Sequence, residues 1–205
     1  MKFRYKTLFA LLLCACALFA VSCRDTQSED GTAVLEDLEA LELSVLEDYV
    51  ALGEYKALDI KLGASSKEDA VWDAIRANCD VKSYPSERVE YYFAQAKAQY
   101  EYYAEMSGID YAQMLTELGK TEAELLSEAE QRAIDDVIFE LVRRKENISL
   151  TEGDKQAHFD KYVEKYVSDY GYTEEYVREN LSEKVYGSML YDKVCEFLIA
   201  NNNFN

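Results

Sequence analysis

Histidine is almost missing from this chain, because His158 is the only one among 205 residues. The sequence therefore has no histidine pair for a metal or for nucleophile–base chemistry, and its five cysteines are not spaced as zinc ligands. His158 lies one helical turn from Asp154, where we expect a surface or satisfied side chain and not a general base. The Gly119-Lys120-Thr121 run lacks the upstream glycine of a phosphate-binding loop. We therefore expect no catalytic site, no metal and no cofactor.

Basic residues are also scarce, with 22 Lys and Arg against 40 Asp and Glu and a formal net charge of −18. Such a surface repels nucleic-acid phosphates and anionic lipid head groups, so we expect no nucleic-acid partner and no charge-driven membrane adhesion. The charge weakly favours basic or unfolded polypeptides as partners. It is explained equally well as a device that keeps the protein soluble.

Long apolar runs are absent except near the N-terminus, where Leu8 to Val21 carries no charge and follows Lys2, Arg4 and Lys6. That run is shorter than the roughly 20 residues of a spanning helix and has the layout of a signal peptide, which we place at residues 1–22. Small residues then lead into Cys23, which resembles a bacterial lipobox. We expect lipid on Cys23 and an extracytoplasmic protein anchored in the cell envelope, and the alternative is a plain secreted protein.

Only Cys79 and Cys195 would remain free to pair in the mature chain, because Cys14 and Cys16 leave with the signal peptide. One disulfide is possible between them. Cys195 lies on an apolar helical stripe, where a free buried thiol is the commoner outcome.

The mature chain divides by pattern into three parts. Residues 23–33 are polar and predict a flexible tether. Residues 34–63 form a linker segment whose first half fits a helix or a strand, and whose second half, from Tyr49 to Leu62, fits two short strands or a strand and a turn. Residues 64–205 are helical throughout.

The helical part predicts an all-α body of about six helices with elongated arms. Each helix has a plausible start and stop signal: Ser66 with Asp69, Pro85 to Ser107-Gly108, Asp110 to Gly119, Thr121 with Glu124 to Lys145, Thr151 with Asp154 to Gly171, and Thr173 onward. The fourth helix has an expected core stripe of Leu125, Ala129, Ala133, Val137, Ile138, Leu141 and Val142. The last is expected to run unbroken, with a stripe from Val177 to Leu198.

Tyrosine is in excess, with 17 in the chain, and five of them crowd one expected arm: Tyr91, Tyr92, Tyr100, Tyr102 and Tyr103. One buried stripe can use only Tyr92, Tyr100 and Tyr103, so we expect exposed aromatic surface at Tyr91 and Tyr102. Tyrosine rings contact many sequences at low entropy cost, and Met106 and Met114 would add an adaptable surface. These seven residues are the candidate site for binding unfolded polypeptides, which we call clients. The competing interpretation is that the rings fill an interface between helices.

The order of the segments resembles trigger factor. DYVALGEYKALDIKL, with Gly53, Tyr55 and Lys56, is similar to the strand leading into its prolyl-isomerase domain, and the stretch from YPSERVEYYF to TELGKTEAELL is similar to the arms of its C-terminal chaperone module. IFELVRRKENISLTEGD and KVCEFLIANNNF resemble the later parts of that module, whose architecture also occurs in SurA-type chaperones. The likeness covers most of residues 49–205.

This resemblance implies an ATP-independent holdase for unfolded or newly exported polypeptides. The isomerase domain would lie between Leu62 and Ser83, where only about twenty residues are present, so we expect no isomerase activity. The ribosome-binding domain is also missing. The alternative functions are a dedicated interaction or assembly lipoprotein and, less favoured, a prolyl isomerase.

Overall fold

The structure is a computed structural model and describes residues 37–205. The expected signal peptide (1–22), the lipidation residue Cys23 and the tether (23–33) lie outside the described residues. Eight helices and four two-residue strands lie within 37–205, so the expected all-α fold with a short N-terminal piece is confirmed. The described chain divides into two compact units, which we call the hairpin unit (residues 150–192) and the arm unit (residues 37–149 and 193–205).

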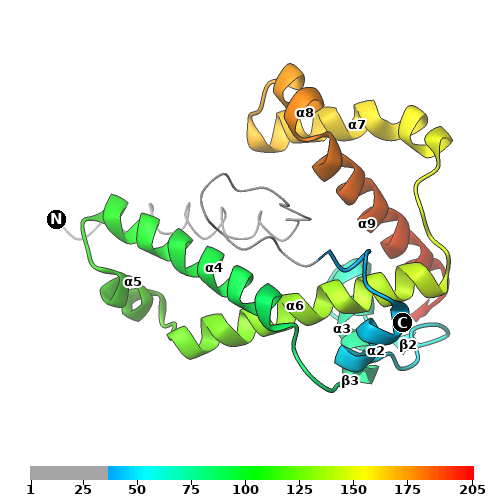
Figure 1. The fold of residues 1–205 in the computed structure, drawn as a ribbon, viewed down its shortest axis with the longest axis horizontal. Coiled ribbons are helices and arrows are strands. Elements are labelled where there is room, and N and C mark those ends of the chain that lie inside the picture. The colour runs from blue at the N-terminus through cyan, green and yellow to red at the C-terminus, as the bar shows by residue number, and fades with distance from the viewer. Residues whose placement is uncertain (1–36) are drawn as a thin grey trace. The chain divides into compact units, whose positions relative to one another are not determined.

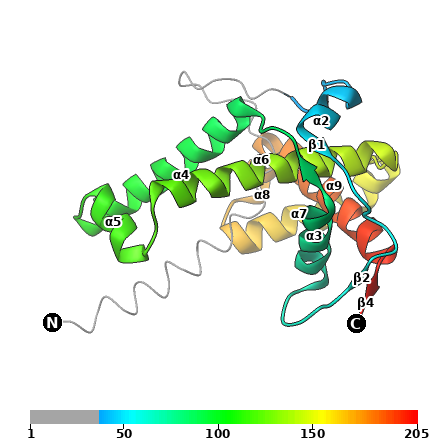
Figure 2. The same ribbon diagram turned by 90° about the horizontal axis from the view of Figure 1, so that it is seen from below.

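Two long helices dominate the arm unit. α4 (Ser86–Ser107) and α6 (Glu122–Lys145) lie side by side and antiparallel, and α5 (Tyr111–Leu118) connects them at one end (Figures 1 and 2). α4 begins directly after Pro85, whose fixed φ suits a helix start. It ends at Gly108, which has φ 68° and takes the left-handed conformation that glycine adopts without strain. With 22 residues, α4 is about 33 Å long.

The caps of α5 and α6 are those that the sequence predicts. Asp110 Oδ1 accepts a hydrogen bond from the Gln113 N–H at 2.8 Å and thereby caps α5. At the start of α6, the Thr121 hydroxyl accepts from the Glu124 N–H at 3.2 Å, and the Glu124 carboxylate accepts from the Thr121 N–H at 2.7 Å. This reciprocal capping box satisfies two helix-end donors that would otherwise lack partners.

The core of the arm unit follows one face of α6. All seven residues of the expected stripe are buried: Leu125, Ala129, Ala133, Val137, Ile138, Leu141 and Val142. Val89 and Tyr92 of α4 pack against Ala129 and Ala133 in one cluster. The two alanines are small, and this lets the backbones of α4 and α6 approach each other at the point where the large Tyr92 ring is buried.

Short strands join distant segments at the base of the arm unit. β1 (Val50–Ala51) pairs antiparallel with β3 (Asp80–Val81), and β2 (Asp59–Ile60) pairs in parallel with β4 (Asn203–Phe204). Of the two alternatives for Tyr49 to Leu62, two short strands or a strand and a turn, the structure has the two strands. Their partners were not predicted, because two-residue strands leave no periodic pattern in the sequence.

The linker before β1 forms a helix where the sequence was ambiguous. α2 (Leu43–Tyr49) buries Leu46 completely and contacts α6. Farther along, Gly53 passes so close to α3 (Lys67–Asn78) that an added Cβ would lie 1.9 Å from the Asn78 carbonyl oxygen. This close approach explains why the segment needs glycine at position 53.

α3 starts as predicted, since the Ser66 hydroxyl accepts a hydrogen bond from the Asp69 N–H at 3.0 Å. Its Trp72 is buried and donates the indole N–H to the Cys195 sulfur at 3.3 Å. Cys79 and Cys195 are both free thiols, and Cys195 is buried, as its position on an apolar stripe predicted.

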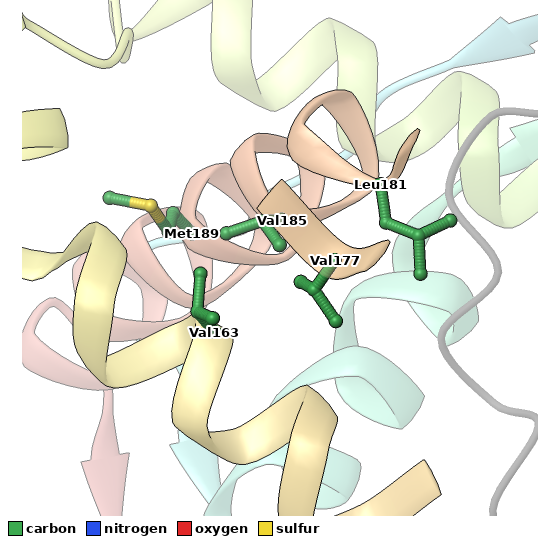
Figure 3. Close-up of a cluster of buried hydrophobic side chains, with 5 residues drawn as sticks. All are labelled: Val163, Val177, Leu181, Val185 and Met189. Carbon is green, nitrogen blue, oxygen red and sulfur yellow. The ribbon is translucent and has the colours of Figure 1, made fainter. Parts of the chain in front are cut away.

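The hairpin unit is built from α7 (Glu152–Tyr170), α8 (Glu174–Asn180) and the part of α9 (Ser182–Ala200) up to Asp192. The predicted capping box of Thr151 and Asp154 starts α7. Side chains from all three helices form one buried cluster, which Figure 3 shows: Val163, Val177, Leu181, Val185 and Met189.

The expectation of one unbroken final helix was wrong. The chain leaves helical geometry at Leu181, where φ is −121° and ψ is 13°, so two helices replace one. The apolar stripe is present in both, and the break allows Val177 of α8 and Val185 of α9 to face the same cluster around Val163. Asn180 and Ser182, which are weak helix formers, flank the break at Leu181.

Candidate functional site

The tyrosines of α4 divide into a buried group and an exposed group. Tyr92 is only 5% exposed and donates its hydroxyl hydrogen to Asp136 of α6. Burial, together with the neighbouring Asp136 charge, raises the pKa of Tyr92 well above its ordinary value. Tyr92 therefore belongs to the interface between α4 and α6 and cannot contact a client, which corrects its assignment to the client-binding set.

Met114 is also part of the core. Its side chain is 1% exposed, because it lies on the buried face of α5 together with Leu115. The prediction that Met114 adds to an adaptable surface was therefore wrong. Helical periodicity placed Met114 on an apolar stripe, but it could not tell which stripes of a short connecting helix remain uncovered.

Three other tyrosines of α4 are half-buried. Tyr91 accepts a hydrogen bond from Gln95 at 2.7 Å, and its ring meets the Tyr92 ring edge-on with centroids 5.4 Å apart. Tyr103 accepts one from Gln99 at 3.1 Å. Tyr100 is half-buried as well. The side chains of Tyr91, Tyr100 and Tyr103 are thus only partly open to solvent, and Tyr91 is less exposed than expected.

A patch of apolar surface lies where α4 approaches α5. Tyr102 is 58% exposed and Met106 is 70% exposed, and their spacing of four residues places them on one face of α4. We call Tyr102 and Met106 the tip patch. Leu126, near the start of the antiparallel partner helix α6, is 42% exposed as well. Tyr102 was predicted to be exposed and Met106 was predicted as surface, whereas Leu126 was missed because it lies next to the buried Leu125.

The tip patch is carried on a firmly anchored helix pair. Asp136 of α6 accepts a hydrogen bond from Arg88 at 2.7 Å in addition to the one from Tyr92, so one carboxylate holds two side chains of α4. Its neighbour Asp135 accepts a hydrogen bond from Arg76 of α3 at 3.1 Å. Burial raises the pKa of Asp135 above its ordinary value, although Arg76 opposes that shift.

The other end of α6 holds a buried charge cluster. Glu140 is 3% exposed and its carboxylate accepts hydrogen bonds from Arg143 at 2.6 and 2.7 Å and from Arg144 at 2.6 Å. Arg144 also donates to the backbone carbonyls of Leu38 and Leu41. Burial raises the pKa of Glu140, but the hydrogen bonds from the two arginines outweigh it and lower that pKa below its ordinary value. The cluster therefore fastens the first described residues to α6.

A second aromatic surface lies in the hairpin unit, and sequence reasoning missed it. Tyr170, Tyr172 and Tyr176 are 40%, 42% and 46% exposed. Their rings form a continuous row with half-buried Tyr166, which we call the tyrosine ladder. The sequence signal for it is four tyrosines within eleven residues around Gly171. Helical periodicity does not show such a cluster, because the cluster crosses the end of a helix.

Residues 37–205 were searched for clusters of metal-ligating side chains and for membrane-spanning helices. Among residues 37–205 there is no group of three or more His, Cys, Asp or Glu side chains placed to hold a metal ion. Within the same range, none of the helices is both long enough and apolar enough to span a bilayer. His158 lies exposed on α7.

Comparison with known proteins gives one match. Residues 61–200 match the family described as bacterial trigger factor protein (TF) C-terminus, a stretch that begins directly after β2 and ends with α9. Among curated proteins and solved structures, none matches the chain. The match covers well over half of the sequence and includes the paired arm helices, the tip patch and the tyrosine ladder. The chain therefore belongs to the trigger factor C-terminal family and carries the chaperone module of that family.

Proposed function

We propose that the protein is an ATP-independent holdase that shields unfolded, newly exported polypeptides from aggregation. The observation that carries the proposal is the tip patch on the paired helices of a trigger factor C-terminal module. Isolated apolar side chains are common on protein surfaces, but an exposed tyrosine and methionine one helical turn apart make a contiguous contact area.

The side chains of the tip patch suit clients of many sequences. A tyrosine ring contacts apolar groups with its faces and amides with its hydroxyl, and it loses little entropy on binding. Methionine is flexible and polarisable and adapts to irregular partners. Weak binding of this kind needs no chemical step, so we propose that the protein is not an enzyme.

The segment that would hold an isomerase domain supports the same view. Within residues 63–83, α3 and β3 account for most of the chain, and both pack within the arm unit. An assay of proline isomerisation in a chromogenic peptide tests this part of the proposal, and catalysed isomerisation would overturn it.

We further propose that lipid on Cys23 anchors the protein to the extracytoplasmic face of a membrane. The support is the basic start, the apolar run and the small residues before Cys23 in the sequence. Metabolic labelling with a fatty acid should mark the wild-type chain and not a Cys23→Ser variant. Equal labelling of both chains would overturn the anchor.

Light scattering by an aggregating client tests the holdase directly. The mature chain, made with Cys23→Ser, should suppress the aggregation of several unrelated denatured clients at ratios of a few molecules per client. A Tyr102→Ser/Met106→Ser double variant should suppress it less, because the tip patch is lost while the fold is not. Tyr84→Ser is the matched control, since Tyr84 is 47% exposed but lies just before α4, outside the patch.

Three outcomes of that assay bear on the function. Loss of suppression in the double variant alone supports the proposal. An equal loss of suppression in Tyr84→Ser would show that the tip patch is not the surface that binds clients. No suppression by the wild-type chain with any client would replace the holdase with the alternative of a dedicated interaction or assembly module, for which tight binding to one folded partner is the expected property.

A further inference from the structure

α5 is a short helix that lies between two glycines. It has eight residues and is found at one end of the two arm helices, where it packs on α4 (Figures 1 and 2). Gly108 precedes it with φ 68° and Gly119 follows it with φ 66°, and a Cβ at either position would meet nothing within 4 Å. Glycine adopts left-handed and right-handed backbone conformations about equally readily. The chain can therefore turn at both ends of α5 without strain in the long helices.

The polar contacts of α5 are mostly internal. Gln113 donates a hydrogen bond to Glu117 at 2.9 Å, and Thr116 donates to a backbone carbonyl one turn earlier at 2.8 Å. The contact with α4 includes Lys97, whose ammonium nitrogen lies 5.5 Å from the centroid of the Tyr111 ring. Lys97 is partly exposed, and a cation over an aromatic ring contributes little at such a site. Burial of apolar side chains therefore supplies most of the free energy that holds α5 in place.

Two adjacent residues of α5 provide this burial. Met114 is 1% exposed and Leu115 is 6% exposed, whereas the other residues of the helix are half-buried or exposed. We call these two residues the plug. An unfolded polypeptide would offer the same kinds of side chain to an apolar surface. Met106 of the tip patch lies two residues before Gly108, so the surface that the plug covers adjoins the tip patch.

A buried hydroxyl at the start of α5 destabilises the position that the helix has in this structure, which we call closed. Burial and the charge of the nearby Glu122 raise the pKa of Tyr111. The Tyr111 hydroxyl nevertheless has no hydrogen-bond partner of normal geometry among residues 37–205. A buried polar group without a partner costs free energy, and water would supply the partner if α5 moved outward. The plug therefore stabilises the closed position, and Tyr111 opposes it.

We propose that α5 is an autoinhibitory flap. In the closed position its plug occupies apolar surface beside the tip patch, and an unfolded segment with apolar side chains displaces the plug and binds there. This role in client uptake rests on the proposed holdase, whereas the opening of α5 is a property of the arm unit that can be measured without a client. A flap of this kind exposes additional apolar surface only when a client takes it up, which limits self-association of the free protein.

Hydrogen exchange measured by mass spectrometry follows the flap in the full chain, kept in mild detergent. Segments that open locally exchange their amide hydrogens sooner than the core does. We expect the amides of residues 114–118 to exchange about tenfold faster, or more, than those of residues 129–142 in α6. Equal protection of the two segments would overturn the flap.

Two variants should change the opening of α5 in opposite directions. Tyr111→Phe removes the unpaired hydroxyl and keeps the ring, so exchange in α5 should slow by about fivefold or more. Met114→Ser weakens the plug, so exchange there should quicken by about tenfold or more. Met189→Ser is the matched control, because Met189 is 4% exposed but lies in the hairpin unit. An equal effect of both methionine variants on α5 would contradict the flap.

A client peptide tests the displacement of the plug. The probe is a twenty-residue peptide that carries leucine and methionine among serine and glycine, and the control peptide has serine in place of every leucine and methionine. Binding of the probe should quicken exchange at residues 114–118. Met114→Ser should bind the probe about fivefold more tightly than wild type, and Tyr111→Phe should bind it more weakly, because each changes the free energy of the closed position.

The outcomes separate the flap from the holdase. Binding of the probe that leaves exchange in α5 unchanged or slower would overturn the flap and leave the holdase standing. Binding of the probe by Met114→Ser and not by wild type would support the flap as an autoinhibitory element. No binding by either chain at about millimolar peptide would overturn both the holdase and the role of the flap in client uptake.

Discussion

Replacing Glu140 with glutamine should weaken the attachment of residues 38–41 to α6 and destabilise the arm unit. The substitution keeps the size of the side chain but removes the charge that Arg143 and Arg144 share. Arg144 would then donate to the carbonyls of Leu38 and Leu41 without its carboxylate partner. The two guanidinium groups would lose the carboxylate that they share, although Glu39 lies 3.9 Å from Arg143.

The magnitude follows from how much of the cluster is buried. Removing one partner of a buried ion pair costs about 3–5 kcal/mol. The side chains of Arg143 and Arg144 keep 17% and 21% of their surface exposed, so water recovers part of this cost. We expect a loss of about 2–3 kcal/mol in the free energy of unfolding. For a chain of this size that corresponds to a fall in Tm of about 4–12 °C.

Urea unfolding between pH 8 and pH 3.5 provides the assay. Because the folded pKa of Glu140 is lowered, its carboxylate stabilises the fold above the unfolded pKa of about 4.3, and this stabilisation is lost as pH falls through the folded pKa. The difference between wild type and Glu140→Gln should therefore be constant above about pH 5 and shrink below about pH 4. Glu105→Gln, on the exposed face of α4, is the control. A difference that does not change with pH would refute the electrostatic explanation.

Three further predictions concern local structure. Thr121→Ala should lower the free energy of unfolding by about 1 kcal/mol, measured by urea denaturation, because the capping box of α6 is lost. Gly53→Ala should lower it by about 3 kcal/mol or more and reduce thermal stability, because the new methyl group would collide with the Asn78 carbonyl. Titration with a thiol reagent should show slow reaction of half-buried Cys79, whose pKa is raised by burial, and reaction of buried Cys195 only on unfolding.

Each of these has its own contrary outcome. Gly153→Ala is the control for Gly53→Ala, because a methyl group at position 153 would lie at an ordinary van der Waals distance of 3.6 Å from the Thr151 hydroxyl oxygen. An equal loss of stability in both variants would contradict the close-approach argument. An unchanged midpoint for Thr121→Ala would mean that α6 does not need its cap. A single fast-reacting pool of two thiols in the native protein would contradict the burial of Cys195.

Helix starts and ends were predictable because each depends on a few neighbouring residues. The Thr121 box, the Asp110 cap and the glycines at positions 108, 119 and 171 act within one turn of the chain, and the structure has all of them. The break at Leu181 was missed because it is a tertiary effect. The sequence on either side continues one apolar stripe, so periodicity does not show the break, which lets Val177 and Val185 both pack in the cluster around Val163.

The candidate site was predictable only in part, for a related reason. Periodicity separates Tyr102 from the buried face of α4, and the structure confirms that Tyr102 and Met106 are exposed. Periodicity cannot show which stripe a neighbouring helix will cover, and Met114 was therefore predicted as surface although it is buried. The tyrosine ladder crosses from α7 to α8, where no single helical period applies, and only the chain reversal at Gly171 brings its rings together.

The central claim, that the tip patch contacts unfolded clients, is tested most directly by photo-crosslinking. A benzophenone amino acid is placed at position 102 or 106, with position 84 as the control, and the mature chain is irradiated with a denatured client and with the same client folded. The account predicts crosslinks from positions 102 and 106 to the denatured client and few from position 84 or to the folded client. Equal crosslinking from all three positions, or none to the denatured client, would contradict it.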